Sequence, residues 1–280
     1  MKIACLGPPG TFSEEAARRW LFQYNISGGV KFFGLIPEIF SSVQSGLVTC
    51  GAVPVENSIE GTVAVTLDYL TREPGVEIKG EVILPVDHCL AVKRKDVGLR
   101  SIRVVYSHPQ ALGQCRLFLE SGLSKVELRQ TASTGEAARM LASSEDDHCA
   151  AVCSAFAAEK HGLEIAANNI QDFPNNKTRF FIVGPPEMEV AMLEPGKTSL
   201  AFSLPEDRPG ALYEVLKDFA CAGINLTKIE SRPSKRELGR YVFYLDCEGY
   251  VSSSPLKEVT AGLKPKTGFL RVLGSYPRAG

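Results

Sequence analysis

The order of strand-type and helix-type segments constrains the fold of this chain more than any other feature of its sequence. Short apolar strand patterns alternate with helix patterns over residues 1–184, which predicts an α/β domain with mostly parallel sheets. A segment at about 185–197 is rich in proline and glycine, which is typical of a linker. Residues 198–280 change to the order strand, helix, strand, strand, helix, strand, the ferredoxin-like βαββαβ pattern. We expect these strands at 199–204, 225–232, 241–246 and 269–273, and these helices at 210–221 and 255–263.

Polar residues follow three predicted strands of the first domain at the point where each strand ends. Polar groups at strand ends over a helix start are the usual ligand sites of open α/β sheets. The same residues would equally serve to shape turns or cap helices, and the spacing alone leaves both readings open. After the third strand, Gln110 and Gln114 lie one helical turn apart, so that Ser107 and Gln114 are within reach of one ligand. The three segments are Gly7-Pro8-Pro9-Gly10-Thr11, Glu56-Asn57-Ser58 and Ser107-His108-Pro109.

A dense polar cluster at 172–179 runs directly into an apolar, β-type segment at 180–183. Aromatic and β-branched residues favour a buried strand, so the polar groups are expected at a strand mouth. An ordinary turn that feeds a strand has a similar composition. Further upstream, residues 86–92 alternate in the strand period, which predicts that His88 is a satisfied sheet histidine.

The composition argues against several classes of function. Lys and Arg number 31 against 32 Asp and Glu, a net charge of -1, so no field for polyanions such as nucleic acid is expected. The eight cysteines are scattered without a Cys-x-x-Cys pair, which indicates reduced, buried thiols. The chain shows neither a signal-peptide core nor an apolar run near the roughly 20 residues that span a bilayer. We therefore expect a cytoplasmic protein with no membrane partner.

Five motifs in order along the chain resemble those of the prephenate dehydratases. The last of them, with Gly210-Ala211-Leu212-Tyr213, resembles the ACT regulatory domain attached to members of this family. The resemblance covers nearly the whole chain, and the set is specific although each motif alone is not. The motifs are Gly7-Pro8-Pro9-Gly10-Thr11-Phe12-Ser13, Pro54-Val55-Glu56-Asn57-Ser58, Ser107-His108-Pro109-Gln110 with Gln114-Cys115, Asn176-x-Thr178-Arg179-Phe180, and Glu230-Ser231-Arg232-Pro233.

The resemblance implies a fold and a function. The fold is a catalytic domain at 1–184 of two α/β lobes, similar to type 2 periplasmic binding proteins, with the second lobe at about 77–158. An ACT domain follows at 198–280. The implied reaction is decarboxylation and dehydration of prephenate to phenylpyruvate in phenylalanine biosynthesis, with phenylalanine as an allosteric inhibitor. This carbon–oxygen lyase reaction is driven by aromatisation and requires no cofactor and no metal. Arogenate dehydratase activity, or a sensor of amino acids without catalysis, are the alternatives.

The resemblance also assigns roles to residues. Thr178 matches the best-supported catalytic position, and Asn57, Ser107 and Gln114 match neutral donors that orient the substrate. Arg179 has the planar fork of a carboxylate clamp, while an intramolecular salt bridge is its alternative. The remaining implied substrate-binding residues are Thr11, Glu56, Ser58, Asn176 and Phe180. The implied phenylalanine site consists of Gly210, Ala211, Leu212, Glu230, Ser231, Arg232 and Pro233.

ACT domains of this type commonly pair side by side, because a ferredoxin-like sheet has exposed edges. We therefore expect a homodimer or a homotetramer. The loop that ends at Gly210 leads into a helix N-terminus, where free N–H groups suit the carboxylate of an amino acid.

Overall fold

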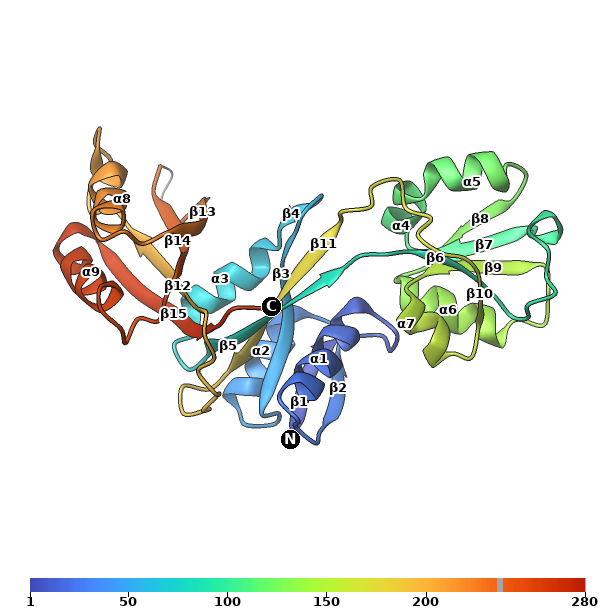
Figure 1. Ribbon diagram of the computed structural model, residues 1–280, viewed down its shortest axis with the longest axis horizontal. Coiled ribbons are helices and arrows are strands. Elements are labelled where there is room, and N and C mark those ends of the chain that lie inside the picture. The colour runs from blue at the N-terminus through green and yellow to red at the C-terminus, as the bar shows by residue number, and fades with distance from the viewer. Residues whose placement is uncertain (236–238, 280) are drawn as a thin grey trace.

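The computed structural model describes residues 1–235 and 239–279, which form three bodies in a row (Figure 1). The ACT-like domain lies at one end, a first α/β lobe in the middle and a second α/β lobe at the other end. Within the described residues the strands form two sheets, one of ten strands and one of five. No helix in this part of the chain is long and apolar enough to cross a membrane.

The first lobe is built on one half of the larger sheet, in which β5, β11, β3, β1 and β2 lie side by side. Strand β1 is parallel to β2 and β3, whereas β11 is antiparallel to both of its neighbours, β3 and β5. The sheet is therefore mixed, because the chain leaves for the second lobe after β5 and returns along β11. The elements are β1 (Lys2–Leu6), α1 (Phe12–Gln23), β2 (Gly29–Phe33), α2 (Ile36–Gln44), β3 (Cys50–Asn57), β4 (Gly61–Thr62), α3 (Ala64–Arg72), β5 (Glu77–Pro85) and β11 (Lys177–Gly184).

The second lobe contains the smaller sheet, in the order β10, β6, β9, β7, β8. The resemblance implies a second lobe from about residue 77, but β5 belongs to the first sheet, and the second lobe continues beyond 158 to β10. The predicted strand at 86–92 begins only at Cys89, so His88 lies in the connection between the lobes and not in a sheet. The elements are β6 (Cys89–Val92), η1 (Leu99–Ser101), β7 (Val104–Ser107), α4 (Pro109–Gln114), α5 (Arg116–Gly122), β8 (Glu127–Gln130), α6 (Thr134–Ser143), β9 (Cys149–Cys153), α7 (Ala155–Lys160) and β10 (Glu164–Ala167).

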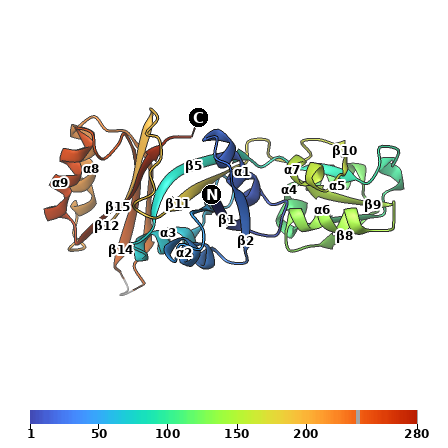
Figure 2. The ribbon, with the colours of Figure 1, turned by 90° about the horizontal axis from the view of Figure 1, so that it is seen from below.

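The third body confirms the predicted βαββαβ order and has its strands in the order β13, β14, β12, β15. Both helices lie on the outer face of this sheet, and its other face is turned toward the first lobe (Figure 2). The first strand begins at Gly196, within the predicted linker. The elements are β12 (Gly196–Ser203), α8 (Ala211–Cys221), β13 (Leu226–Pro233), β14 (Tyr241–Glu248), α9 (Leu256–Leu263), η2 (Lys264–Lys266) and β15 (Phe269–Pro277).

Strand β15 joins the third body to the first lobe, since it pairs in parallel with β5 at Gly274 and Ile78. A Cβ on Gly274 would lie 2.3 Å from the carbonyl oxygen of Ile78, so only glycine permits this approach. The two halves are thereby hydrogen-bonded into one continuous sheet. Apolar clusters cover both faces of the first-lobe half, one around Trp20 and Phe180 and the other around Phe40 and Phe181. The apolar packing on both faces thus fixes the positions of the strand ends that carry the polar residues.

Candidate functional site

A cavity of about 270 Å³ lies between the two α/β lobes. Its lining comes from the first turn of α1, the ends of β3 and β11, the connection between the lobes, helix α4 and the start of α6. Its lining residues include no Lys, Arg, Asp or Glu. The lining residues are Thr11, Phe12, Ser13, Asn57, Val86, His88, His108, Gln110, Ala111, Gln114, Ala132, Ser133, Thr134, Asn176 and Thr178.

Asn57 and Thr178 form the polar centre of the first-lobe wall. They are directly opposite one another on the antiparallel strands β3 and β11. The Asn57 amide nitrogen Nδ2 donates to Thr178 Oγ1 and to Asn176 Oδ1, both at 2.8 Å. Its Oδ1 accepts from the backbone N–H groups of Ile59 and Glu60, which fixes the orientation of the amide. Because Thr178 Oγ1 accepts from Asn57, its own proton is left for a ligand in the cavity.

Gln114 and His88 form a second polar pair, contributed by α4 and by the connection between the lobes. His88 Nε2 lies 3.1 Å from Gln114 Oε1, and because a carboxamide oxygen only accepts, Nε2 donates. Burial lowers the pKa of His88, against the opposing effects of the Gln114 hydrogen bond and the Asp87 charge. Among the described residues, His88 Nδ1 and Gln114 Nε2 have no hydrogen-bond partner although both are buried. A ligand that both accepts and donates hydrogen bonds would satisfy these atoms.

The N-termini of α1 and α6 approach one another at the cavity from opposite lobes. Thr11 and Ser133 are the residues that precede these two helices, and both line the cavity. A Cβ on Gly135 would lie 2.7 Å from the carbonyl carbon of Gly10, so the backbones of the two lobes are in contact there. Helix N-termini carry partial positive charge and free N–H groups. The cavity therefore favours anionic groups although no Lys or Arg lines it.

The sequence relationships of the chain agree with this arrangement. The prephenate dehydratase family model matches residues 3–188 and the ACT domain model matches residues 198–259. A prephenate dehydratase of Methanocaldococcus jannaschii is 39% identical over 270 residues, which cover 96% of each chain. The chain belongs to the prephenate dehydratase family.

Two solved structures share the fold. The prephenate dehydratase of Arthrobacter aurescens in complex with L-Phe is 33% identical, with a TM-score of 0.87 over 100% of this chain and 90% of that chain. GqqA, described as a novel type of quorum quenching acylase, is 29% identical, with a TM-score of 0.85 over 100% of this chain and 98% of that chain. The dehydratase fold thus also occurs in a protein described by a different activity.

Of the residues implied by the family resemblance, Thr11, Asn57, Gln114, Asn176 and Thr178 line the cavity together. Thr11 does not cap α1 through its side chain, since its hydroxyl donates to the Leu6 carbonyl at 3.0 Å.

The structure contradicts the assignment of Arg179 as a carboxylate clamp, because Arg179 does not line the cavity. Successive side chains of a strand point to opposite faces, so with Thr178 in the cavity Arg179 points away from it. Its guanidinium is buried and donates to Glu81 Oε2 at 2.6 Å, to Tyr276 Oη at 3.0 Å and to the Asp246 carboxylate. Burial opposes its charged form, but Tyr276, Asp246 and Glu81 outweigh this and raise the pKa of Arg179 further. The salt-bridge alternative is the one that the geometry supports.

Ser107, Phe180, Glu56 and Ser58 also lie outside the cavity lining. Ser107 is fully buried and donates to the Val152 carbonyl at 2.6 Å, so its hydroxyl is occupied within the second lobe. Phe180 shares the face of Thr178 but belongs to the apolar core. Glu56 pairs with Lys228 at 3.2 Å, and Ser58 accepts from the Lys177 N–H at 2.9 Å, which steadies the strand mouth.

Sequence reasoning missed most of the second-lobe wall. The alternating pattern at 86–92 predicted a strand, so His88 was assigned to a sheet, but the strand begins only at Cys89. Ser133 precedes α6 and Thr134 begins it, and Ser133 caps this helix by accepting from the Glu136 N–H at 3.0 Å. The available signal was a fourth helix start of the same α/β pattern, with Ser133 as its cap residue.

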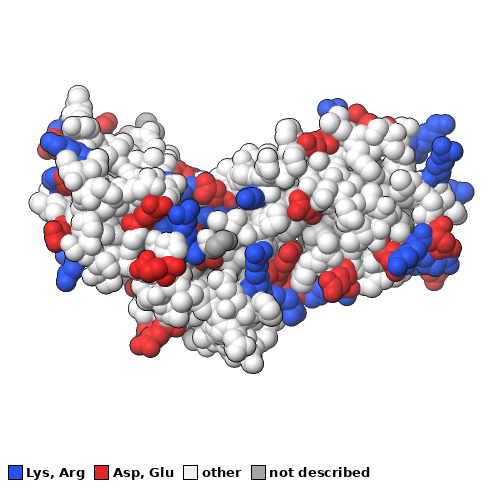
Figure 3. Space-filling model, viewed as in Figure 1, with Lys and Arg blue, Asp and Glu red and all other residues white. Residues whose placement is uncertain are grey.

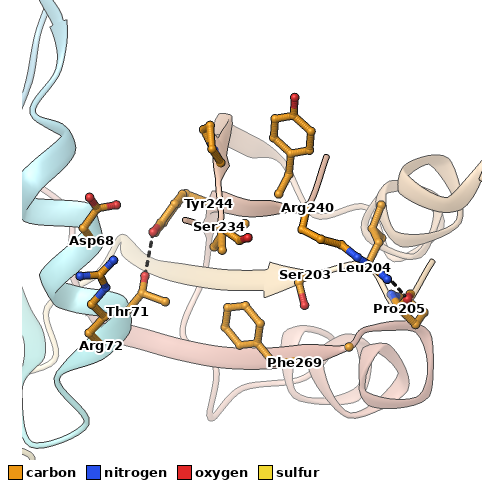
Figure 4. Close-up of a pocket in the computed structure, with 14 residues that line it drawn as sticks. Asp68, Thr71, Arg72, Ser203, Leu204, Pro205, Ser234, Arg240, Tyr244 and Phe269 are labelled. Carbon is orange, nitrogen blue, oxygen red and sulfur yellow. Dashed lines mark hydrogen bonds between the residues drawn. The ribbon is translucent and has the colours of Figure 1, made fainter. Parts of the chain in front are cut away.

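A larger cavity of about 640 Å³ lies between α3 and the inner face of the ACT sheet. Figure 4 shows Asp68, Thr71 and Arg72 at α3, facing Tyr244 and Phe269 of the ACT strands, with the Thr71 hydroxyl bonded to the Tyr244 hydroxyl at 2.9 Å. Of the residues implied for phenylalanine binding, Pro233 lines this cavity.

The other implied effector residues lie around the sheet. Glu230 accepts from the Thr62 hydroxyl of β4, and Arg232 pairs with Asp68 of α3 at 3.7 Å. Gly210 precedes α8 with a φ of +83°, a left-handed conformation that glycine adopts without strain. Strand β14 separates β13 from β12, the strand that leads to α8. In one chain the segment at 230–233 therefore lies on β13, whereas the segment at Gly210 lies at the start of α8, after β12.

Proposed function

We propose that this chain is a prephenate dehydratase that converts prephenate to phenylpyruvate, carbon dioxide and hydroxide. Prephenate is a dianion with a ring hydroxyl. The observation that carries the proposal is the Thr178 hydroxyl, which lines the cavity and accepts from Asn57, so that its own proton is available to a substrate there. The family membership, and the activity for which the Methanocaldococcus jannaschii relative is named, support the same reaction.

The residues of the cavity suit this chemistry. As the carbon–carboxylate bond breaks, its electron pair moves into the ring and expels the hydroxyl oxygen as hydroxide, so the charge of -2 is conserved in phenylpyruvate and hydroxide. Thr178 donates to the departing oxygen with a bond that strengthens as negative charge develops there, and the bond from Asn57 polarises the hydroxyl. A lining without Lys or Arg is favourable at the leaving carboxylate, because tight ion pairing would stabilise the ground state.

His88 and Gln114 complete the hydrogen bonding of the substrate in this proposal. Gln114 Nε2 donates and the neutral His88 Nδ1 accepts, so together they suit a group with both an acceptor and a proton. The helix N-termini behind Thr11 and Ser133 receive the carboxylate that is retained. Aromatisation supplies the driving force, and the proposal includes no cofactor.

The test is incubation of the purified chain with prephenate and measurement of phenylpyruvate by its ultraviolet absorbance in alkali. Turnover of arogenate to phenylalanine in place of prephenate would move the assignment to arogenate dehydratase. Absence of both products from a folded protein that still binds phenylalanine would favour a sensor. An acyl-amide substrate forms the third arm, because the fold also occurs in GqqA; release of its acyl group without phenylpyruvate would contradict the proposal.

We also propose that phenylalanine inhibits the enzyme from the ACT domain, where the segment at Gly210 of one subunit and the segment at 230–233 of another would form its site. The phenylalanine complex of the Arthrobacter aurescens relative supports binding. Strand β13 ends the sheet of the described residues with an unpaired edge, which supports a homodimer or homotetramer. A monomer in sedimentation at micromolar concentration would contradict the assembly. A cytoplasmic location is proposed because all eight cysteines are free thiols.

A further inference from the structure

Arg179 connects the strand of Thr178 to the ACT domain through a buried cluster of charges. Its Nε donates to Glu81 of β5 at 2.6 Å, within the first lobe. Its other two nitrogens reach across to the ACT domain, where Nη1 donates to Asp246 of β14 and Nη2 donates to Tyr276 of β15 at 3.0 Å. The guanidinium also lies 4.7 Å from the ring centre of Phe181. One side chain is thus fixed by both domains.

The cluster is closed by further groups of the ACT domain. Lys197 of β12 donates to the two carboxylate oxygens of Glu81 at 2.9 and 3.1 Å. The Ser199 hydroxyl donates to Asp246 Oδ1 at 2.6 Å. Two buried cations and two buried carboxylates therefore compensate one another, and none of these four is more than 9% exposed. Compensation of this kind depends on geometry, since a displaced partner leaves a buried charge without its counterion.

Thr178, which precedes Arg179 on β11, lines the cavity between the α/β lobes. Thr178 and Arg179 are held in register by β3 on one side and by β5 on the other. The position of the Thr178 hydroxyl relative to Asn57 therefore depends on where the backbone of Arg179 is held. A shift of the ACT sheet relative to β5 must either break the bonds of Arg179 or move β11 with it.

We propose that Arg179 is a positioning residue through which Asp246 and Tyr276 of the ACT domain set the position of Thr178 in the cavity. The proposal rests on the dehydratase reaction proposed above, in which Thr178 donates to the departing oxygen. It gives the ACT domain a direct route to the reacting group that passes through no helix and no second subunit. A ligand that displaces the ACT sheet would then change turnover without touching the cavity.

A double-mutant cycle on steady-state kinetics tests this route. Asp246→Asn removes the charge with little change of shape, and Tyr276→Phe removes one hydrogen bond of Arg179 and is the milder change for folding. Each is expected to lower kcat/KM by at least about tenfold, and by less than about twofold when Thr178 is already replaced by valine. Equal losses in both backgrounds would show that these residues act only on overall stability and would overturn the proposal.

Asp218→Asn is the matched control within the ACT domain. Asp218 pairs with Lys266 at 2.7 and 2.8 Å and has no part in the cluster. We expect this variant to retain kcat/KM within about twofold, because a surface ion pair contributes little. If Asp218→Asn lowered kcat/KM as much as Asp246→Asn, any loss of charge in the ACT domain would suffice, and the route through Arg179 would be refuted.

A readout without substrate separates this proposal from the proposed function. In protein labelled with ¹³C in threonine methyl groups, the Thr178 resonance is identified by its loss in Thr178→Val. We expect Asp246→Asn and Tyr276→Phe to shift this resonance, and Asp218→Asn to leave it unchanged. An unmoved Thr178 resonance in folded Asp246→Asn and Tyr276→Phe protein would overturn the positioning role whether or not the chain turns over prephenate.

Discussion

Replacement of Thr178 by valine removes the proposed donor hydroxyl and keeps a β-branched residue on β11. The stability cost follows from the bonds of Asn57, whose Nδ2 loses the 2.8 Å bond to Thr178 and retains Asn176 Oδ1 at 2.8 Å and the Lys177 carbonyl at 3.3 Å. One neutral hydrogen bond contributes about 0.5–1.5 kcal/mol net, so the free energy of unfolding is expected to fall by no more than that.

The expected loss of turnover is much larger. Positioned proton or hydrogen-bond donation contributes about 10²–10⁴-fold, which corresponds to roughly 3–5 kcal/mol of the barrier. We therefore expect kcat of Thr178→Val to fall by about 10²–10⁴, measured by phenylpyruvate release, with the unfolding free energy measured by urea titration. Thr178→Ser keeps the hydroxyl and is the matched control, which we expect to retain most of the turnover. A Thr178→Val protein that turns over within about threefold of wild type would refute a donor whose share of the rate is at least about 10²-fold.

Three further predictions concern other parts of the chain. Gly135→Ala places a methyl group 2.7 Å from the backbone of Gly10, so the lobes are held apart and kcat/KM falls by about 10²-fold in steady-state assays, whereas Gly113→Ala, with nothing within 4 Å, serves as the unaffected control. Burial lowers the pKa of His88 below its unfolded value of about 6.5, so the unfolded chain binds the proton more readily than the folded one and the free energy of unfolding falls as the pH falls below that value. His88→Gln is expected to flatten this pH dependence of the unfolding free energy in urea titrations between about pH 5 and 7. Gly210→Val places a β-branched residue at a φ of +83° and is expected to abolish phenylalanine binding in calorimetry; undiminished binding would exclude this loop.

The sequence was sufficient to predict elements whose patterns are local. The βαββαβ order of the ACT domain follows from turn residues and apolar periodicity, and it is observed. The first-lobe half of the cavity was predicted because family motifs fall at the ends of β1, β3 and β11. The positions of these residues are set mainly by the strands at whose ends they lie.

Features that depend on tertiary contacts were not predicted. Alternation of apolar and polar residues, as at 86–92, occurs both in strands and in extended connections, and His88 lies in the connection between the lobes. The position of β5 in the first sheet depends on its pairing with β11 and β15, which are about 100 and 190 residues away along the chain. Arg179 could have been assigned correctly from strand periodicity, since Thr178 and Arg179 cannot both face the cavity.

A bulge in β3 determines the face of the sheet on which the Asn57 side chain lies. Val53 and Val55 pack in the apolar cluster that includes Phe181, so strict alternation would direct Asn57 to that face and away from Thr178. The pairing of β3 with β11 shifts between Glu56, opposite Arg179, and Pro54, opposite Phe180, so that Val55 has no partner. A bulge of this kind changes the phase of a strand and re-aims the side chains beyond it. Glu56 then shares the face of Arg179, at 3.8 Å, and Asn57 reaches Thr178 on the cavity face. The extra residue at Val55 is therefore what allows one strand to support the apolar core at its centre and to orient the Thr178 hydroxyl, the proposed donor, at its end.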